Sequence, residues 1–398
     1  MTRPPRLPVV YAYPGCRWDM PPGRHKALME ALAGHTRIFF LNWPEFRGTY
    51  TEVLRPRAEK IADNITVIHN AFGLRFARGG KRLGRAAGAL DGTWIKDLLR
   101  GHGVTDYVYW IAAVSPALLW GMNTRRFVFD CIDPCFDPAW QARFDREEAF
   151  LARKARVVFA TAESLWERMK AHNPNSHLLP NGCNESEYHP EKLARLPRPA
   201  ALQGRTGPVI GYMGTFDWRI DATTLTAAAQ KMPDCTFALV GRVNSDQEAN
   251  VATLRSLPNV VMPGAVSLED GWAWTAAFDV GLIPFQPGDM GDAINPVKMH
   301  MYLMAGKPVV TTWIRECRRH GPLVRATQTP EQFVTAIRES LAECSPADVA
   351  RRLAFSRAHT WKARAAEAAD ILDRTGLWDG RRTASSPAVD LRSTAKPV

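Results

Sequence analysis

The feature that most constrains the fold is a regular alternation of short apolar runs with segments long enough to form helices. In the second half of the chain the apolar runs are Pro208–Met213, Thr236–Gly241, Asn259–Met262, Asp279–Pro284 and Pro308–Thr312. Such alternation predicts a parallel sheet covered by helices. We therefore expect an α/β fold in this half of the chain.

The first half of the chain repeats the pattern. Strand-like runs lie at Leu7–Ala12, Ile38–Leu41, Ile65–Ile68, Tyr107–Ile111, Phe127–Phe129, Val157–Ala160 and His177–Leu179. Helical patterns lie at Gly23–Ala33, Thr93–Leu99, Asp137–Ala152 and Ser164–His172. A chain of 398 residues is long enough for two domains of ordinary size.

Changes of composition predict the domain boundaries. Residues 1–190 form the first expected domain, and residues 191–207, rich in Pro, Arg, Ala and Leu without periodicity, form a linker. A second domain is expected over residues 208–345, followed by a helical pattern over residues 346–374. Residues 380–398 are rich in Ser, Thr, Ala, Pro and Arg, a composition typical of a disordered tail.

The formal charge of +11 suits an anionic partner. The densest basic clusters lie at residues 75–85 and 315–319, and because no nucleic-acid-binding motif accompanies them, no nucleic acid is expected. The first cluster, with Phe72, Leu74 and Phe76 beside it, is expected either to contact an anionic membrane surface or to be a solvated loop. No apolar run approaches the roughly 20 residues of a membrane span, so a cytoplasmic protein is expected.

The seven cysteines predict neither a disulfide framework nor a metal site. They are scattered, and only Cys131 and Cys135 lie close together, with no second Cys or His pair at zinc-finger spacing. Reduced, mostly buried thiols and no metal are expected.

Two joints between strand and helix are suited to an anion. At Gly211–Phe216 a strand is predicted to enter a glycine turn and then a helix, and Asn295–Lys298 precedes a predicted helix at Met299–Ala305. Asn is a favoured N-cap and Pro a favoured first helical residue. Helix amides, the helix dipole and Lys298 can together hold a diphosphate. The residues expected at this site are Gly214, Thr215, Phe216, Arg219, Arg242, Asn295, Pro296, Val297 and Lys298.

Three strings resemble a known family. They are NPVKMHMYLMAGKPVV at residues 295–310, FDVGLIPF at residues 278–285, and LPNGCN at residues 179–184, followed by Tyr188 and Pro190. They resemble elements of the GT-B glycosyltransferases, and more closely the bacterial family-four-like enzymes (glycosyl transferases group 1) of polysaccharide biosynthesis. The resemblance is strong over residues 177–312. It is weaker in the first half, where Trp18-Asp19, Arg24-His25 and Phe129–Asp133 are similar to elements of the same group.

This resemblance implies the GT-B fold, in which two Rossmann-like domains face each other across a cleft. The second domain would bind a nucleotide-sugar donor, a UDP- or GDP-sugar, and the first a glycan or lipid-linked acceptor. The helices of residues 346–374 would return to the first domain. The implied activity is a hexosyltransferase of cell-envelope polysaccharide synthesis, cytoplasmic and peripheral at the inner face of the membrane. No cofactor is expected, and because the donor half lacks a DxD sequence, no metal is expected.

One departure from the family pattern concerns two glutamates eight positions apart. At these positions the chain has Ala293 and Met301, and the second glutamate normally holds the ribose. We therefore expect Met301 to line a more apolar nucleotide pocket, because a thioether is only a weak hydrogen-bond acceptor. The alternative is that Met301 packs inside the domain. Asp289 and Asp292 either replace part of this role or are loop residues in solvent.

On the acceptor side, Asp19 and Asp133 are the candidate catalytic bases. Asp19 follows the first predicted strand, and Asp133 follows the strand ending at Phe129, although either is equally suited to cap a helix. Trp18, Arg24 and His25 are the expected acceptor-binding residues.

Two alternative functions stay open. The missing carboxylates at positions 293 and 301 are compatible with a catalytically silent nucleotide-sugar-binding protein of the same fold. A sugar-nucleotide epimerase can share the fold but needs acids and histidines around the sugar, and His300 is the one histidine near the donor motif.

Overall fold

The structure is a computed structural model that describes residues 6–20, 23–43, 56–71, 81–119, 121–122, 124 and 126–379; for residues 81–87 and 117 it describes the backbone alone. The chain divides into two compact units. The first comprises residues 1–179 and 365–398, and the second residues 180–364. The division therefore falls earlier than residue 190. Residues 191–207 lie inside the second unit, where they include part of a short helix.

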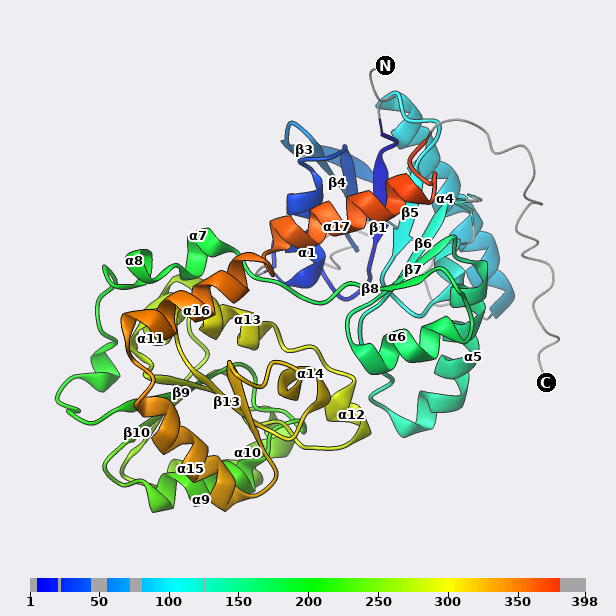
Figure 1. Cartoon of the computed structure of the whole chain (residues 1–398). Coiled ribbons are helices and arrows are strands. Elements are labelled where there is room, and N and C mark those ends of the chain that lie inside the picture. The colour runs from blue at the N-terminus through cyan, green and yellow to red at the C-terminus, as the bar shows by residue number, and fades with distance from the viewer. Residues whose placement is uncertain are drawn as a thin grey trace. The chain divides into compact units, whose positions relative to one another are not determined.

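The first unit contains an eight-stranded sheet in the order β3-β4-β2-β1-β5-β6-β7-β8 (Figure 1). Only β3 is antiparallel to its neighbour, β4; the other pairs are parallel. The strands are β1 Val9–Ala12, β2 Ile38–Leu41, β3 Arg57–Ala62, β4 Ile65–His69, β5 Val108–Ile111, β6 Phe127–Cys131, β7 Val157–Ala160 and β8 Ser176–Leu178. The helices are α1 Arg24–Leu32, α4 Lys81–Gly101, η1 Pro116–Leu119, η2 Pro138–Trp140, α5 Gln141–Lys154 and α6 Glu163–Lys170, joined from residue 365 by α17 Trp361–Arg374.

The second unit contains a six-stranded parallel sheet in the order β11-β10-β9-β12-β13-β14. Its strands are β9 Val209–Met213, β10 Thr236–Val240, β11 Val260–Gly264, β12 Val280–Ile283, β13 Val309–Thr312 and β14 Val324–Thr327. Its helices are α7 Glu185–Tyr188, α8 Pro190–Leu193, η3 Ala200–Leu202, α9 Ala222–Lys231, η4 Ser245–Gln247, α10 Glu248–Arg255, α11 Leu268–Ala277, α12 Asp289–Asp292, α13 Val297–Met304, α14 Arg315–Arg318, α15 Pro330–Leu341 and α16 Pro346–Arg357.

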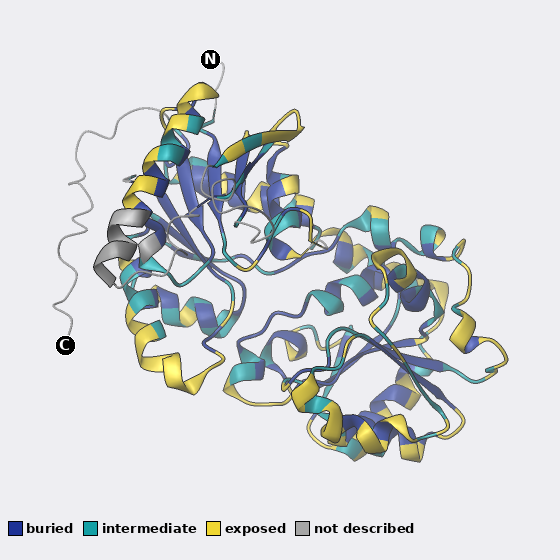
Figure 2. Ribbon diagram, turned by 180° about the vertical axis from the view of Figure 1, so that it is seen from behind, coloured by how far each residue is buried: buried dark blue, intermediate teal, exposed yellow. Residues whose placement is uncertain are grey.

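Every strand-like run expected from the sequence is a strand, which confirms the α/β prediction. Apart from the exposed β3 and the partly exposed β11, the strands lie in the interior of each unit, while the outer faces of the helices are exposed (Figure 2). In the second unit α9, α10 and α15 pack together on one face of the sheet, and α11, α13 and α16 lie on the other (Figures 1 and 2).

In the second sheet the chain runs outward from β9 through β10 to β11, then returns to β12 on the other side of β9. This order is that of the doubly wound Rossmann fold, in which ligands bind at the carboxyl ends of the strands where the order reverses. The reversal lies between β9 and β12. The residues that follow these two strands are therefore the place to look for a ligand site.

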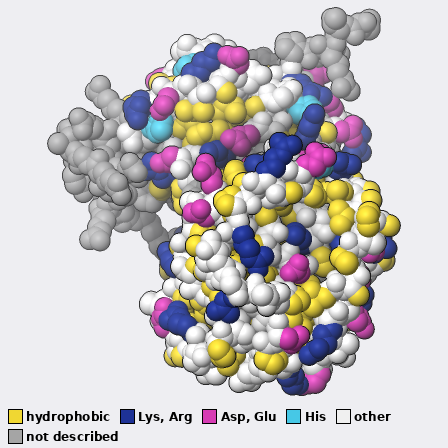
Figure 3. All heavy atoms as spheres, turned by 90° about the vertical axis from the view of Figure 1, so that its left-hand side faces the viewer, with side chains coloured by type: hydrophobic (Ala, Val, Ile, Leu, Met, Phe, Trp, Pro, Cys, Tyr) yellow, Lys and Arg dark blue, Asp and Glu magenta, His cyan; other side chains and the backbone are white. Residues whose placement is uncertain are grey.

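Among the described residues, no helix is both long and apolar enough to cross a membrane. The basic cluster at residues 75–85 lies outside the residues whose side chains are described. On the face drawn in Figure 3, Lys and Arg side chains are interspersed with Asp and Glu side chains, so the charge of +11 is not gathered into one patch on that face.

Candidate functional site in the second unit

Two contacts of Tyr302, one through its ring and one through its hydroxyl, hold helix α13 close to the carboxyl end of β9. The ring of Tyr302 on α13 lies against Gly281 of β12, where a Cβ would come within 2.4 Å of that ring. The hydroxyl of Tyr302 accepts a hydrogen bond of 2.9 Å from the backbone N–H of Met213, the last residue of β9. The small residue at position 281 therefore lets Tyr302 hold the first turns of α13 over the end of β9.

This packing places Lys298 over Gly214. A Cβ added to Gly214 would lie 2.6 Å from Lys298 Cε and 2.9 Å from Lys298 Nζ. Gly214 has a φ of 151°, which side-chain-bearing residues rarely adopt, and its N–H donates to Val240 O at 2.9 Å. Glycine is thus required at this position both for its backbone conformation and for the approach of the lysine.

The ammonium group of Lys298 lies among aromatic rings. Its Nζ is 5.4 Å from the ring centroid of Tyr212 and 5.1 Å from that of Phe285. Desolvation by burial, assisted by the charge of Arg219, lowers the pKa of Lys298 to about 8. Among the described residues no carboxylate or carbonyl pairs with this ammonium. A partly desolvated cation without a partner is suited to an anionic ligand.

A second cation, Arg219, stands beside Lys298 and is held by Asp217. Both oxygens of Asp217 accept hydrogen bonds from Arg219 Nε, at 2.9 and 3.1 Å, and the guanidinium lies 5.8 Å from the ring of Phe285. Burial by itself would raise the pKa of Asp217, but the hydrogen bonds from Arg219 and the charges of Arg219 and Lys298 outweigh it and lower that pKa. Asp217 therefore stays ionised and orients Arg219.

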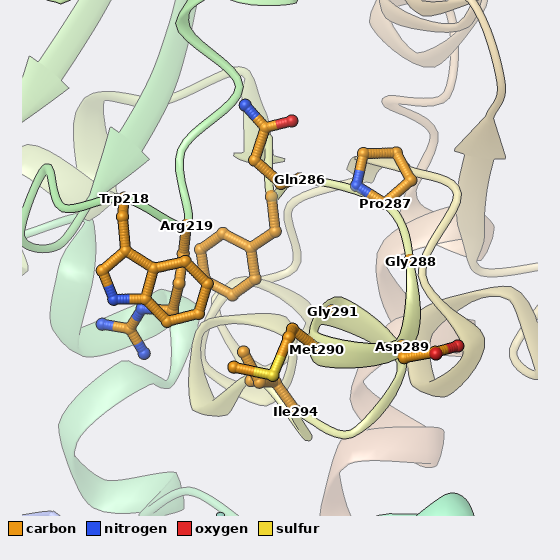
Figure 4. Close-up of a pocket in the computed structure, with 10 residues that line it drawn as sticks. Trp218, Arg219, Gln286, Pro287, Gly288, Asp289, Met290, Gly291 and Ile294 are labelled. Carbon is orange, nitrogen blue, oxygen red and sulfur yellow. The ribbon is translucent and has the colours of Figure 1, made fainter. Parts of the chain in front are cut away.

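A pocket of about 260 Å³ opens beside Arg219 (Figure 4). It is lined by Trp218, Arg219, Phe285, Gln286, Pro287, Gly288, Asp289, Met290, Gly291 and Ile294. Trp218 and Arg219 come from the segment after β9, and the other residues come from the segment after β12. Trp218 is 41% exposed, which offers a broad apolar surface to a ligand. The segments after β9 and β12 thus supply Arg219 and the pocket, and α13 supplies Lys298.

The glycine joint differs from the expectation in one respect. No helix begins at Gly214; α9 begins at Ala222, and Asp221 caps it by accepting from Thr224 N at 2.9 Å. The side chain of Phe216 is fully buried and packs against Tyr212 with ring centroids 5.0 Å apart. The anion site at this joint therefore has a glycine and two cations but no helix dipole.

The structure also differs from the expectation that Asn295 is the N-cap of the helix that follows it. Pro296, not Asn295, is the N-cap of α13, and Val297 is its first residue. Asn295 is buried; its Oδ1 accepts from Asn181 N at 3.0 Å and its Nδ2 donates to Glu316 at 2.9 Å. Its side chain therefore ties neighbouring segments of the second unit together and is not available to a ligand.

The other predicted donor residues are dispersed around this centre. Thr215 is half-buried, and its carbonyl accepts from the Tyr212 hydroxyl at 3.1 Å. Arg242 is exposed after β10, and its carbonyl accepts from Phe216 N at 2.8 Å. Its guanidinium has no partner among the described residues.

Met301 does not lie where the sequence suggested. Its half-buried side chain packs against an apolar cluster of Cys183, Tyr188 and Met304. Ala293, the other position without a glutamate, is buried. The structure gives Met301 a packing role in this cluster, in place of the expected position facing an open nucleotide pocket.

Candidate acceptor residues in the first unit

The loop after β1 contains Trp18 and Asp19. Trp18 is buried, with its ring edge-on to Phe40 at 5.2 Å and Lys26 Nζ at 5.3 Å from its ring centroid. Asp19 is exposed and accepts two hydrogen bonds from Arg17, at 2.9 and 2.8 Å. These bonds lower the pKa of Asp19, which makes this carboxylate a weaker base.

Arg24 is buried, contrary to its expected role as an acceptor-binding residue. Its guanidinium bonds Asp130 at 2.9 and 3.3 Å and Leu179 O at 3.0 Å. Asp130, itself buried, also accepts from Trp110 Nε1 at 3.2 Å. This ion pair joins α1 to β6 inside the first unit, so Arg24 has a structural role.

His25 and Asp133 both lie near the carboxyl end of the first sheet. His25 is half-buried, its Nδ1 lies 2.5 Å from the Tyr11 hydroxyl, and its ring stacks on Tyr13 at 3.7 Å. Asp133 is exposed beyond β6. Burial raises the pKa of Tyr13, and the charge of Asp133 raises it further, which places Asp133 near Tyr13.

Some residues of these sites were not foreseen. The contacts of Tyr302 and Phe285 are with residues distant in sequence, and Asp217 acts through its ion pair with Arg219. Nothing in the local sequence pattern distinguishes these three residues. No local signal marks Trp218 as exposed either. No group of three or more His, Cys, Asp or Glu residues suited to a metal occurs in the described part of the chain.

Comparison with known proteins gives a family for this region. Residues 207–343 match the family model of glycosyl transferases group 1. Over these residues the chain is similar to the group 1 glycosyltransferases. The match spans β9 to α15 and so includes Gly214, Arg219 and Lys298. The predicted resemblance is confirmed over this region.

A curated relative extends this finding. Over 204 residues the chain is 30% identical to the "Putative teichuronic acid biosynthesis glycosyltransferase TuaH" of Bacillus subtilis (strain 168). The alignment covers 46% of this chain and 50% of the relative, so the chain matches about half of that protein's length.

Solved structures agree on the fold. Sucrose-phosphate synthase (tll1590) from Thermosynechococcus elongatus has a TM-score of 0.67 at 16% identity, covering 93% of this chain and 99% of that chain. Anabaena Alr3699/HepE, solved in complex with UDP and glucose, has a TM-score of 0.65 at 17% identity and covers 92% of this chain and 99% of that chain. The predicted GT-B fold is thereby confirmed.

Proposed function

We propose that the protein is a glycosyltransferase that moves a sugar from a nucleoside-diphosphate donor to a glycan or lipid-linked acceptor of polysaccharide biosynthesis. The observation that carries the proposal is the unpaired ammonium of Lys298, held over Gly214 at the carboxyl end of β9 within the group 1 domain. In the proposed complex Lys298 binds the diphosphate. The pocket formed by Trp218, Phe285 and Met290 receives an adjoining part of the donor.

Transfer breaks the bond between the sugar and the diphosphate, so negative charge grows on the leaving phosphate. An ammonium already in place stabilises this charge in the transition state more than in the ground state. Arg219, oriented by Asp217, adds a second positive charge nearby. Two fixed cations are the chain's own means of stabilising the leaving group, so we propose transfer without a metal ion, with a UDP- or GDP-sugar as donor.

The remaining parts of the proposal concern the acceptor and the cellular location of the protein. The first unit would bind the acceptor, with either Asp19, which accepts hydrogen bonds from Arg17, or Asp133 as the base. The inner face of the cell membrane, with the protein peripheral and cytoplasmic, is the proposed location. The basic cluster proposed to contact anionic lipid is the segment at residues 75–85.

A silent nucleotide-sugar-binding protein is the second candidate, favoured by Ala293 and Met301, which supply no carboxylates at the positions where the family has glutamates. The experiment that separates the two is slow donor hydrolysis by the pure full-length protein, measured with a panel of UDP- and GDP-hexoses. An enzyme releases free sugar from at least one donor, faster than a Lys298→Met variant does. Binding without any release would support the silent protein.

A further inference from the structure

The pairing of Tyr11 with His25 determines which ring nitrogen of the histidine carries a proton. Tyr11 is buried in β1, and its hydroxyl lies 2.5 Å from His25 Nδ1. No other described group is available to this hydroxyl. A phenol has one proton to donate, and a buried hydroxyl proton needs an acceptor.

Two arrangements of protons are conceivable. If Tyr11 donates to Nδ1, the buried hydroxyl proton is satisfied, and the neutral ring carries its proton on Nε2. If instead Nδ1–H donates to Tyr11, the hydroxyl proton is left without an acceptor in a buried position, a loss comparable with that of a whole hydrogen bond. The first arrangement is therefore favoured, and it makes Nε2–H a donor.

The surroundings of the His25 ring also fix its orientation and keep it uncharged. It stacks on Tyr13 with an interplanar angle of 12° and a centroid separation of 3.7 Å. Desolvation by burial and the charge of the adjacent Arg24 lower the pKa of His25 to about 3, so the ring is neutral at physiological pH. No described group pairs with Nε2, and this nitrogen is not among those fully enclosed without a partner.

The position of His25 suits a ligand contact. It lies in the first turn of α1, directly after the loop from β1, at the carboxyl edge of the first sheet where α/β folds bind ligands. Asp133 stands near Tyr13 at the same edge. A neutral N–H donor at such an edge matches the oxygen of an uncharged alcohol.

We propose that His25 binds the acceptor saccharide by donating Nε2–H to one of its hydroxyl oxygens, and that it is not the base of the reaction. The proposal rests on the glycosyltransferase function proposed above and assigns the acceptor contact to one atom. A base at this position would have to accept a proton on Nε2, which the Tyr11 hydrogen bond already keeps protonated. His25 is thus a binding residue, and proton removal falls to another group such as Asp133.

The tautomer can be measured without any turnover. Histidine-labelled full-length protein is examined by nitrogen–proton correlation spectroscopy at neutral pH, and the His25 signal is identified by its loss in His25→Gln. We expect Nε2 protonated and Nδ1 bare. In Tyr11→Phe this preference should relax toward a mixture of tautomers. It should persist in the control Tyr107→Phe, which removes the buried hydroxyl of the residue directly before β5, a hydroxyl that donates to Met122 O instead. A protonated Nδ1 in the unaltered protein would overturn the proposal.

The ligand class is tested on the same signal by titration with a set of methyl hexopyranosides up to their solubility limits. A shift of the His25 Nε2 resonance with at least one of them supports a saccharide at this donor; no shift with any of them overturns that part. The same titration with UDP-glucose is expected to leave the resonance in place, and a shift with the donor alone would assign His25 to the donor side. Because neither measurement needs transfer, a failed transfer assay would count against the proposed function and leave the His25 result intact.

Discussion

Gly214 and Lys298 are neighbours across the carboxyl end of β9: a Cβ at position 214 would lie 2.9 Å from the lysine Nζ. The absence of a side chain at position 214 therefore lets the lysine side chain approach the backbone of the loop after β9. The same closeness makes the site sensitive to a single methyl group.

Gly214→Ala should therefore weaken both the fold and the site. The methyl group would collide with Lys298 Cε at 2.6 Å, and the φ of 151° is strained for alanine. We expect the free energy of unfolding to fall by about 1–3 kcal/mol, the usual cost of such a backbone conformation. Nucleoside-diphosphate affinity should fall as well. Gly101→Ala is the matched control, because a Cβ there meets nothing within 4 Å. Equal effects of the two substitutions in denaturation and calorimetry would contradict the assignment.

Lys298→Met should lower the affinity for a nucleoside diphosphate by roughly 1.5–3 kcal/mol, the range for a charge-assisted hydrogen bond, or about 10–150-fold. Stability should not fall, because the substitution removes a desolvated charge without a partner. Lys231→Met, which removes a surface lysine paired with Glu331, is the control and should leave the affinity unchanged. Calorimetric titration together with a denaturation curve separates loss of binding from loss of fold.

Diphosphate affinity should decline as the pH rises above about 8. The free protein loses the Lys298 proton through its lowered pKa of about 8, whereas the bound diphosphate requires the ammonium. Binding above this pH must take up a proton, so the dissociation constant should rise by up to roughly tenfold per pH unit. The slope should be absent in Lys298→Met. A dissociation constant that stays the same between about pH 7.5 and about pH 9.5 would show that this ammonium does not bind the ligand.

His300→Phe should stabilise the protein by about 1 kcal/mol. His300 is buried on α13, and neither of its ring nitrogens has a hydrogen-bond partner in the described structure. Its ring stacks on His359 at 5.9 Å, an arrangement that phenylalanine preserves. Removing an unsatisfied polar group outweighs the modest extra volume. Chemical denaturation at neutral pH measures the effect. A large loss of stability would show that His300 makes a stabilising hydrogen bond that phenylalanine cannot make.

The same residue predicts a pH dependence of stability. Desolvation, with the charges of Arg364, His359 and His320, holds the pKa of His300 well below 6.5. Below pH 6.5 the unfolded chain therefore binds a proton that the folded chain does not, and stability falls as the pH falls. The contribution of one such group is about 1.4 kcal/mol per pH unit. Denaturation between neutral and mildly acidic pH should show a slope smaller by this amount in His300→Phe.

Transfer should proceed in the presence of a chelator, because Lys298 and Arg219 supply the positive charge that a metal would otherwise provide. The measurement is donor hydrolysis with and without EDTA. Loss of all turnover in EDTA, restored by Mn²⁺ or Mg²⁺, would contradict metal-independent transfer.

The strands were predictable because each contains a short apolar run, and most of these runs are buried on both faces. Two strands, β3 and β14, were not predicted, and they show where an apolar run fails to mark a strand. The edge strand β3 is almost entirely exposed and contains Arg57, Glu59 and Lys60, so no apolar run marks it. β14 has only four residues and contains Arg325. The place of Lys298 in the first turn of a helix was predictable because a Pro precedes that helix, while its role in binding stays a prediction.

The errors came from contacts between distant residues. Asn295 has the residue type of an N-cap, but Asn181 and Glu316 occupy its side chain. Arg24 has the position of a ligand-binding residue, but Asp130 of β6 neutralises it in the interior. The Tyr11–His25 bond depends on the turn between β1 and α1, which periodicity does not specify. Hydrogen bonding thus decided which polar residues of the predicted site remain available to a ligand.

The most direct test of the account is calorimetric titration of the full-length protein with UDP, GDP, UMP and GMP, in the unaltered chain and in Lys298→Met. The account predicts that at least one diphosphate binds roughly tenfold or more tightly than its monophosphate, and that this advantage disappears in the variant. Equal binding of diphosphate and monophosphate, or an advantage that survives Lys298→Met, would contradict it.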